Sequence, residues 1–242
     1  MKRTMLSAAK IKEIRSLREK KFRDGLGLFC VEGEKMVAEA LASGLEVVEV
    51  YRKEDIGEKA MERISALSSP SPVLAVVRMP SPVKPAVGGL CLALDGIRDP
   101  GNMGTILRTA DWFGITDIVC SPDTADVYNP KVVQATMGSI ARVRVHYTDL
   151  PRFLRSIPKE IPIYGTLLDG DDIYSNPLTH NGIIVMGNEG NGLSQEVRQL
   201  LTHRLLIPSF AAPSAAGHAE SLNVSIATAV ILSEFRGRVK KT

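Results

Sequence analysis

Polar side chains that could orient a ligand occur in three short segments, the first between Leu94 and Arg108. Asn102 and Arg108 lie six residues apart, nearly two helical turns, so both project towards the same side of a helix. A guanidinium there could grip a phosphate through two parallel hydrogen bonds. The structural alternatives are a helix cap for Asn102 and an exposed salt bridge for Arg108. Gly101 and Gly104 do not continue as the G-x-G-x-x-G dinucleotide fingerprint, which argues against a nicotinamide-dependent dehydrogenase.

The second segment follows an apolar run, Ile183 to Met186, with a loop that contains three glycines. Asn188 and Glu189 stand directly after the run, where the carboxyl end of a buried strand would place them. Ligands of open α/β sheets bind at that end of the strands. Glycines in the loop permit positive φ angles and a close backbone approach to a ligand, although an ordinary glycine turn explains the bends equally well.

The third segment runs from Glu220 to Ala229 and continues into an apolar stretch. Ser221 alone would be a helix cap, and Leu222 and Ile226 alone would be part of a core stripe. Small residues along the expected helix indicate a neighbour that lies very close, either another helix or a ligand.

These segments belong to a region in which apolar runs alternate with helical patterns. Strands are expected at residues 90–94, 118–120, 142–145, 163–166, 183–186 and 205–207, and helices at 103–113, 131–137, 150–156, 194–200 and 221–235. Near-continuous apolar strands separated by helices indicate an α/β fold, with a mostly parallel sheet covered by helices on both faces.

A smaller α/β domain is expected at residues 1–80, followed by a proline- and glycine-rich linker at 81–89 and the larger domain at 90–242. In the small domain the patterns predict helices at 7–20, 34–42 and 53–67, and strands at 28–31, 47–51 and 73–77.

Charge is distributed unevenly along the 242 residues. The first 87 residues carry 16 basic and 12 acidic side chains, and the remainder carries 14 and 15. A basic N-terminal part on a near-neutral remainder suits attraction to a phosphate backbone. The alternative is that these basic residues form an ordinary solvated helix face. The three cysteines lack metal-ligand spacing, so we expect buried reduced thiols, no metal and a cytoplasmic location. The longest apolar run, 226–232, is too short to cross a membrane.

Together and in this order, the three segments resemble the SpoU, or TrmH-like, branch of the SPOUT RNA methyltransferases. The matching strings are DPGNMGTILRTADWFG, MGNEGNGLS and ESLNVSIATA, with NPKVVQATMGSI between the first two. The resemblance covers essentially all of residues 90–236. The front part, especially FCVEG at 29–33 and VLAVV at 73–77, resembles the ribosomal-protein-like substrate-binding domain that is often fused to this enzyme.

This resemblance implies a trefoil knot in the C-terminal domain, a homodimer formed through that domain, and S-adenosylmethionine as the methyl donor. It implies methylation of a ribose 2′-hydroxyl in a structured RNA, and it favours ribosomal RNA over transfer RNA as the substrate. The catalytic residues would be Asn102, Arg108, Glu189, Ser221 and Asn223, and the donor would be held by Thr166, Leu167, Leu168, Met186, Gly187, Asn188, Gly190, Ile207 and Leu222.

The family assigns removal of the hydroxyl proton to the arginine that matches Arg108. Because arginine stays protonated in proteins, we instead expect Arg108 to grip a phosphate and stabilise the oxyanion. The loop at 209–219 is longer than is usual for the family and could act as a lid over the donor pocket; its His218 is left outside the catalytic set. A non-catalytic RNA-binding or ribosome-assembly protein on the same fold is the alternative function.

Overall fold

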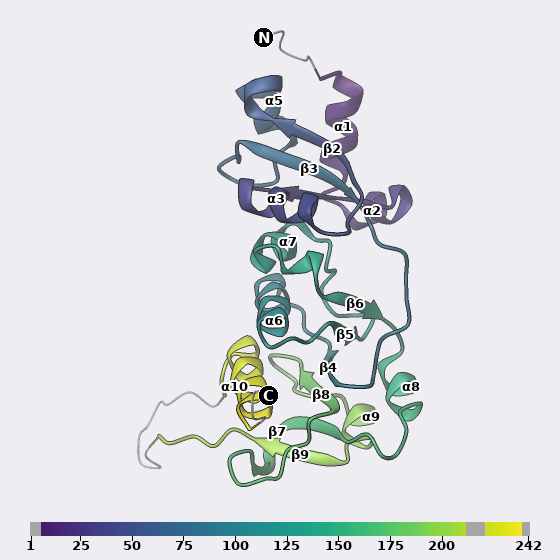
Figure 1. The fold of residues 1–242 in the computed structure, drawn as a ribbon, viewed down its shortest axis with the longest axis vertical. Helices are drawn as coiled ribbons and strands as arrows, with labels where there is room; N and C mark the ends of the chain where they lie inside the picture. Colours follow the sequence, from purple (N-terminus) through teal and green to yellow (C-terminus); the bar gives the residue numbers. More distant parts are fainter. Residues whose placement is uncertain (1–5, 212–220, 239–242) are drawn as a thin grey trace. The chain divides into compact units, whose positions relative to one another are not determined.

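The structure, a computed structural model, describes residues 6–211 and 221–238. The chain forms two compact units, one built from Met1–Pro82 with Asp126–Arg142 and the other from Val83–Ala125 with Val143–Thr242 (Figure 1). The sequence patterns place the 126–142 segment in the larger domain, whereas its contacts group it with the smaller unit.

The smaller unit is a three-stranded antiparallel sheet in the order β1-β3-β2. Residues of its two apolar clusters cover opposite faces of the central strand: Leu74 and Val76 pack with helices α1 and α5, and Ala75 and Val77 with α3 and α7. The alternation of inward-facing residues along a strand produces this arrangement. The elements are α1 (Ala8–Ser16), α2 (Lys20–Leu26), β1 (Leu28–Glu32), α3 (Glu34–Ala42), β2 (Val47–Arg52), α4 (Lys53–Ile56), α5 (Glu58–Ile64), β3 (Val73–Arg78), α7 (Pro130–Thr136) and the 3₁₀ helix η1 (Ser139–Ala141).

Two expected helices of this unit are shorter than their patterns suggest. The helix expected at 7–20 ends at Ser16, whose hydroxyl donates back to the Glu13 carbonyl at 2.6 Å and so competes with the helical ladder. A separate helix, α2, follows it and was not expected. The helix expected at 53–67 is divided at Gly57, whose φ of 84° lies outside the helical region.

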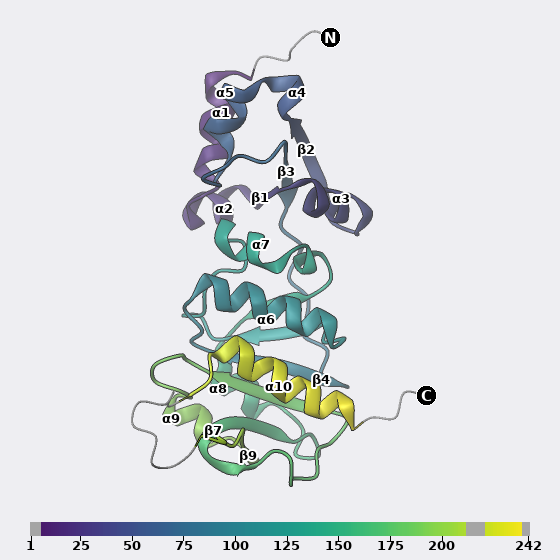
Figure 2. The same ribbon diagram turned by 90° about the vertical axis from the view of Figure 1, so that its left-hand side faces the viewer.

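The larger unit is a six-stranded parallel sheet in the order β6-β5-β4-β8-β7-β9. Helices α6 and α10 pack together on one face and α8 and α9 cover the other, which confirms the expected α/β architecture (Figures 1 and 2). The elements are β4 (Leu90–Asp95), α6 (Pro100–Trp112), β5 (Asp117–Cys120), β6 (Arg144–Tyr147), α8 (Leu150–Arg155), β7 (Ile163–Asp172), β8 (Gly182–Gly187), α9 (Gln195–Arg198), β9 (His203–Leu206) and α10 (Val224–Gly237).

A buried charge cluster fixes the edge strand β6 to β5. The Asp117 carboxylate accepts hydrogen bonds from Arg144 Nη2 at 2.6 Å and from the His146 ring at 2.8 Å. Burial alone would raise the pKa of Asp117, but the hydrogen bonds from Arg144, His146 and Thr116 outweigh it and hold this pKa below its usual value. Charge-assisted hydrogen bonds therefore anchor β6, which forms one edge of the sheet.

Candidate active site

The three segments singled out in the sequence meet at the carboxyl edge of the parallel sheet. Strands β4 and β8 are neighbours in register, with Asp95 beside Gly187, so their following loops lie side by side. Helix α6 begins in the loop after β4, and α10 crosses the same face against α6. Sheet topology thus brings residues 121 positions apart into one site.

Asp99, not Asn102, caps helix α6. The Asp99 Oδ1 atom accepts the backbone N–H of Asn102 at 2.7 Å, and Pro100 occupies the first turn, where its missing N–H costs nothing. The side chain of Asn102 is therefore released from the capping role that was its structural alternative.

Asn102 instead joins the other two segments. Its Nδ2 atom donates to Glu189 Oε1 at 3.0 Å, and its Oδ1 atom accepts from Asn223 Nδ2 at 2.9 Å. Asn223 also caps α10, because its Oδ1 accepts the backbone N–H of Ser225 at 2.9 Å. Asn223 rather than Ser221 is thus the cap of α10. The Asn102 amide orients one residue from each of the other two segments, Glu189 and Asn223.

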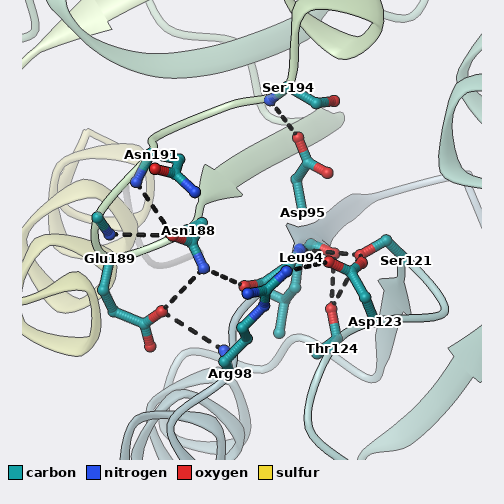
Figure 3. A network of polar contacts seen from close by, with 12 residues as sticks. Leu94, Asp95, Arg98, Ser121, Asp123, Thr124, Asn188, Glu189, Asn191 and Ser194 are labelled. Atoms are coloured by element: carbon teal, nitrogen blue, oxygen red, sulfur yellow. Dashed lines mark hydrogen bonds and ion pairs between the residues drawn. The ribbon is translucent and has the colours of Figure 1, made fainter.

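Glu189 lies at the N-terminus of α6. Its carboxylate accepts a long hydrogen bond of 3.4 Å from the backbone N–H of Arg98 (Figure 3). It accepts a second, also of 3.4 Å, from the backbone N–H of Asp99, in addition to the bond from Asn102. All three of these groups are donors, so the Glu189 carboxylate serves as a hydrogen-bond acceptor in this cluster.

Arg108 and Ser221 do not join this cluster. Arg108 is exposed on α6 and makes no hydrogen bond or ion pair with any residue that the structure describes. Ser221 is also exposed and directly follows the undescribed residues 212–220. Most of the 209–219 loop, His218 included, lies outside the described residues.

The backbone positions expected to hold a methyl donor come from the middle of β7 and from the carboxyl ends of its neighbours β8 and β9. Residues Tyr164 and Gly165 of β7 pair with both β8 and β9, so these three strands are neighbours. Thr166 Oγ1 donates to the Val185 carbonyl at 3.3 Å, which ties the middle of β7 to β8. The side chain of Leu168 beyond it is 71% exposed, and Leu222, next to the cap of α10, is 50% exposed.

The glycines after β8 serve the loop's own packing. A Cβ on Gly187 would lie 2.5 Å from the carbonyl carbon of Gly192, so the loop folds back onto the strand end. Asn188 and Gly192 exchange backbone hydrogen bonds of 2.9 Å. The Asn188 Oδ1 atom accepts the next two backbone N–H groups of the loop, at 3.0 Å each. Close approach at Gly187 thus involves the chain itself, and the ligand contact expected there would be made by the backbone.

The sequence interpretation missed a second polar group beside this cluster, made by Asp95, Ser121 and Asp123. Ser121 Oγ accepts the backbone N–H of Gly96 at 2.8 Å and donates to Asp123 Oδ1 at 2.7 Å. Asp95 ends an apolar strand, and a polar residue at that position was the available signal. A larger cavity, about 470 Å³, lies in the smaller unit, and both cations and carboxylates line it, so it has no single charge preference.

The three thiols do not form a site. Cys91 and Cys120 are fully buried, and Cys30 is partly buried rather than buried as expected. Burial raises the pKa of Cys30 and of Cys91 to about 12, so neither is a thiolate at neutral pH. Within the described residues there is no group of three or more His, Cys, Asp or Glu placed to hold a metal ion. None of the described helices is long and apolar enough to span a membrane.

A parallel α/β sheet with a polar cluster at its carboxyl edge defines a ligand-binding α/β protein, and sequence comparison gives its family. The chain belongs to the SpoU rRNA methylase family, whose model matches residues 89–233. Residues 8–76 match the MRM3-like substrate binding domain.

Full-length relatives and solved structures agree with this family. The chain is 31% identical to the 23S rRNA (guanosine(2553)-2′-O)-methyltransferase RlmP of Bacillus subtilis, over 94% of this chain and 96% of the relative. It matches the AdoMet-bound rRNA methyltransferase of Sinorhizobium meliloti with a TM-score of 0.86 and 30% identity, covering 100% and 99% of the two chains. The SpoU methyltransferase AviRb of Streptomyces viridochromogenes, in complex with AdoMet, matches with a TM-score of 0.81 and 26% identity over 98% and 100%.

Proposed function

We propose that this protein transfers a methyl group from S-adenosylmethionine to a ribose 2′-hydroxyl of ribosomal RNA in the cytoplasm. The observation that carries the proposal is the Asn102 amide, which holds Glu189 and Asn223 in one cluster beside the strand ends suited to the donor. RlmP, a 23S rRNA 2′-O-methyltransferase, matches nearly the whole chain and favours ribosomal over transfer RNA. Residues 1–80 would hold the RNA, in keeping with their match to a substrate-binding domain.

The middle of β7 and the carboxyl ends of β8 and β9 fit the donor, because these strands are neighbours and offer backbone groups next to exposed apolar side chains. S-adenosylmethionine supplies a methyl group already activated on a sulfonium. The residues assigned to hold it are Thr166, Leu167, Leu168, Met186, Gly187, Asn188, Gly190, Ile207 and Leu222. Of these, Met186 is buried and Gly187 is closed off by Gly192, so their contribution would come from the backbone.

The remaining chemical task is to align the ribose hydroxyl and accept its proton. Alignment alone can supply roughly 7–11 kcal/mol of a barrier in well-oriented cases. Asn102, Glu189 and Asn223 are mutually ordered and would orient the ribose, with Ser221 beside them. Arg108 is exposed and has no intramolecular partner within the described residues, so its guanidinium is available to an RNA phosphate. The phosphate or a bound water would then accept the proton.

Arg108→Ala tests this assignment. We expect methyl transfer to ribosomal RNA to fall by at least about a hundredfold, because the oxyanion and the phosphate lose their cationic partner. Affinity for S-adenosylmethionine, measured by calorimetry, should stay within about twofold. Arg108→Lys, which keeps the charge but loses the bidentate fork, should lie between the two. Unchanged turnover in Arg108→Ala would remove Arg108 from the mechanism.

A non-catalytic ribosome-assembly role is the alternative. Calorimetry separates the two functions, because an assembly factor need not bind S-adenosylmethionine. Mapping of 2′-O-methyl groups in total RNA, with and without the gene, would then identify the target. A ribosomal site that loses its methyl group supports the proposal, and a transfer RNA site would change the substrate.

We also propose a homodimer formed through α6 and α10. These helices pack together and carry Trp112, 85% exposed, and Ile226, 53% exposed (Figure 2). Large apolar side chains exposed beside a catalytic cluster are typical of a protein interface. Ile226→Glu should therefore yield monomers in light scattering at concentrations where the wild type is dimeric. A wild-type monomer at about 50 μM would contradict the interface, because stable homodimers persist well below that concentration.

A further inference from the structure

A small polar cavity of about 140 Å³ lies next to the Glu189 cluster, at the carboxyl ends of β4, β5 and β8. It is smaller than the roughly 300–1,000 Å³ of a typical small-molecule site, so it could take a single planar ring system rather than a whole cofactor. Figure 3 shows its walls, which come from loops far apart in the sequence. The polar side chains that line it belong to Asp95, Arg98, Asp123, Asn188, Asn191 and Ser194.

Asp95 is the unusual member of this lining. The residue is 8% exposed, and its Oδ2 atom accepts the backbone N–H of Ser194 at 2.7 Å. The Oδ1 atom has no hydrogen-bond partner among the described residues. The residue as a whole is largely buried, so little water reaches this oxygen and a donor from a ligand in the cavity could satisfy it. The cavity that it lines is where such a donor would be placed.

The other lining groups narrow the chemistry of the ligand. Arg98 and Asp123 face each other at 3.5 Å and are 69% and 55% exposed, so this ion pair is open to exchange. The side-chain amide of Asn191 makes no hydrogen bond within the described residues and can donate. The lining thus offers one acceptor on a buried residue, Asp95, and two exposed donors, Arg98 and Asn191. A metal ion is not favoured, because the described residues include no group of three or more His, Cys, Asp or Glu placed to hold one.

Guanine matches this pattern. Its N2 amino group and the adjacent N1–H are neighbouring donors that a carboxylate can accept, and its O6 and N7 are acceptors suited to an arginine. Each carboxylate oxygen has two acceptor positions, so Asp95 Oδ2 can keep the Ser194 bond while a ligand binds. Adenine, cytosine and uracil do not present two adjacent donors on one edge.

The cavity shares a wall with the cluster assigned to the ribose. Asn188 Nδ2 donates to the Gly96 carbonyl at 2.6 Å, and it also lies 3.4 Å from Glu189 Oε2. A nucleotide whose ribose lies at Asn102 would therefore place its base next to Asn188, on the wall that the cavity and the cluster share. Enzymes that modify RNA commonly unstack the target base and read its hydrogen-bonding edge in such a pocket.

We propose that this cavity binds the base of the target nucleotide and that the base is guanine, with Asp95 accepting from N1 and N2. Arg98 and Asn191 donate to the opposite side of the ring. This inference rests on the proposed 2′-O-methylation, but it adds a claim that the methylation itself does not require. Asp95 is accordingly a specificity-determining residue rather than a residue that touches the methyl group.

Asp95→Asn tests the proposal with nearly unchanged shape. The asparagine oxygen can still accept the Ser194 N–H, while the atom facing the cavity becomes a donor. RNA transcripts carrying either guanosine or inosine at the mapped target would be methylated under single-turnover conditions, because inosine lacks only the N2 amino group. Glu160→Gln, which removes an exposed carboxylate of the same unit, is the matched control.

We expect the wild type and Glu160→Gln to methylate the guanosine transcript about tenfold or more faster than the inosine transcript, as loss of a hydrogen bond to a charged group implies. In Asp95→Asn the guanosine rate should fall and the preference should disappear, with affinity for S-adenosylmethionine and the melting temperature unchanged. If Asp95→Asn melts lower, the wild-type ratio of guanosine to inosine rates still tests the base.

Two results would overturn the proposal while the proposed function stands. One is a mapped target other than guanosine, and the other is an equal loss of rate on both transcripts in Asp95→Asn. Absence of methylation on any ribosomal RNA would instead defeat the proposed function. In that case guanosine 5′-monophosphate, titrated against the S-adenosylmethionine-loaded protein by saturation-transfer NMR, would have to bind better than inosine 5′-monophosphate for the cavity assignment to survive.

Discussion

At the scale of single residues, the site depends on one side-chain amide. Asn102 donates to Glu189 and accepts from Asn223, and a side-chain amide offers both functions from one planar group without any change of protonation. The sequence predicted that Asn102 and Glu189 matter, because Glu189 stands at the carboxyl end of an expected strand and Asn102 at the start of the helix that follows another. It could not give their contact, since that depends on β4 and β8 being neighbours in the sheet.

Asn102→Asp should convert this cluster into a pH-dependent one. A second carboxylate would face Glu189, and two carboxylates that share a site raise the pKa of one of them. Above that raised pKa the repulsion separates the pair, and below it a shared proton restores a hydrogen bond. We therefore expect activity relative to wild type to be about ten- to a hundredfold lower at pH 8 and to recover as the pH falls. Asn102→Ala should show no recovery, and a pH-independent ratio for Asn102→Asp would contradict the contact.

At the scale of elements, apolar patterning predicted a strand at each place where the larger unit has one, most accurately for β4 and β8, which are continuous buried apolar runs. β7 continues to Asp172, beyond its expected end at residue 166, and the more exposed strands β6 and β9 each begin two residues away from their expected starts. Helix boundaries were less accurate where side chains compete for backbone groups, as at Ser16 and Asn223. The three-glycine loop was assigned to ligand approach, yet contacts across the loop decide the conformation at Gly187. Such contacts depend on how the chain folds in three dimensions, and they leave no periodic pattern in the sequence. The knot implied by the resemblance stays a prediction.

Gly187→Ala should destabilise the loop that positions Glu189. The new methyl group would lie 2.5 Å from a backbone carbon of Gly192, and backbone cannot move aside cheaply. We expect the free energy of unfolding, measured by urea titration, to fall by roughly 1–3 kcal/mol. Gly190→Ala is the matched variant, because its Cβ would meet Asn188 Oδ1 at 3.7 Å, an ordinary contact; its effect should stay within about 0.5 kcal/mol. Equal stability of the two variants would refute the close approach.

At the scale of the whole molecule, the smaller unit is not built from one continuous stretch of chain. Val133 of α7 belongs to the apolar cluster on one face of its sheet, and Tyr128 packs on Phe29 with ring centroids 4.7 Å apart. Arg142 donates to Glu39 at 2.8 Å. Composition predicted the domain boundary at the proline-rich linker, and the 126–142 segment has no comparable run of prolines and glycines. Its membership follows from packing, which linear composition does not record.

A buried ion pair within this composite unit joins Arg23 of α2 to Asp126. Arg23 is 2% exposed and lies 2.5 Å from the Asp126 carboxylate, and its Nη1 atom donates to the carbonyls of Leu17 and Arg18. Asp126→Ala would leave the guanidinium buried without its counter-charge. We expect a loss of roughly 3–5 kcal/mol in the stability of this unit, the usual cost of breaking a buried ion pair from one side.

Hydrogen exchange measured by mass spectrometry can assign that loss to its place in the molecule. In Asp126→Ala, amides of β1 and α2 should exchange faster, while those of β4 in the larger unit should keep wild-type protection. Asp24→Ala provides the control, because Asp24 pairs with Lys20 on the exposed side of the same helix and such pairs contribute about 0.5 kcal/mol or less. Adding Arg23→Met to Asp126→Ala should recover part of the stability, since the unpaired charge is then removed. Unchanged exchange in β1 of Asp126→Ala would show that the 126–142 segment does not stabilise the unit, and the smaller unit would then end at the linker.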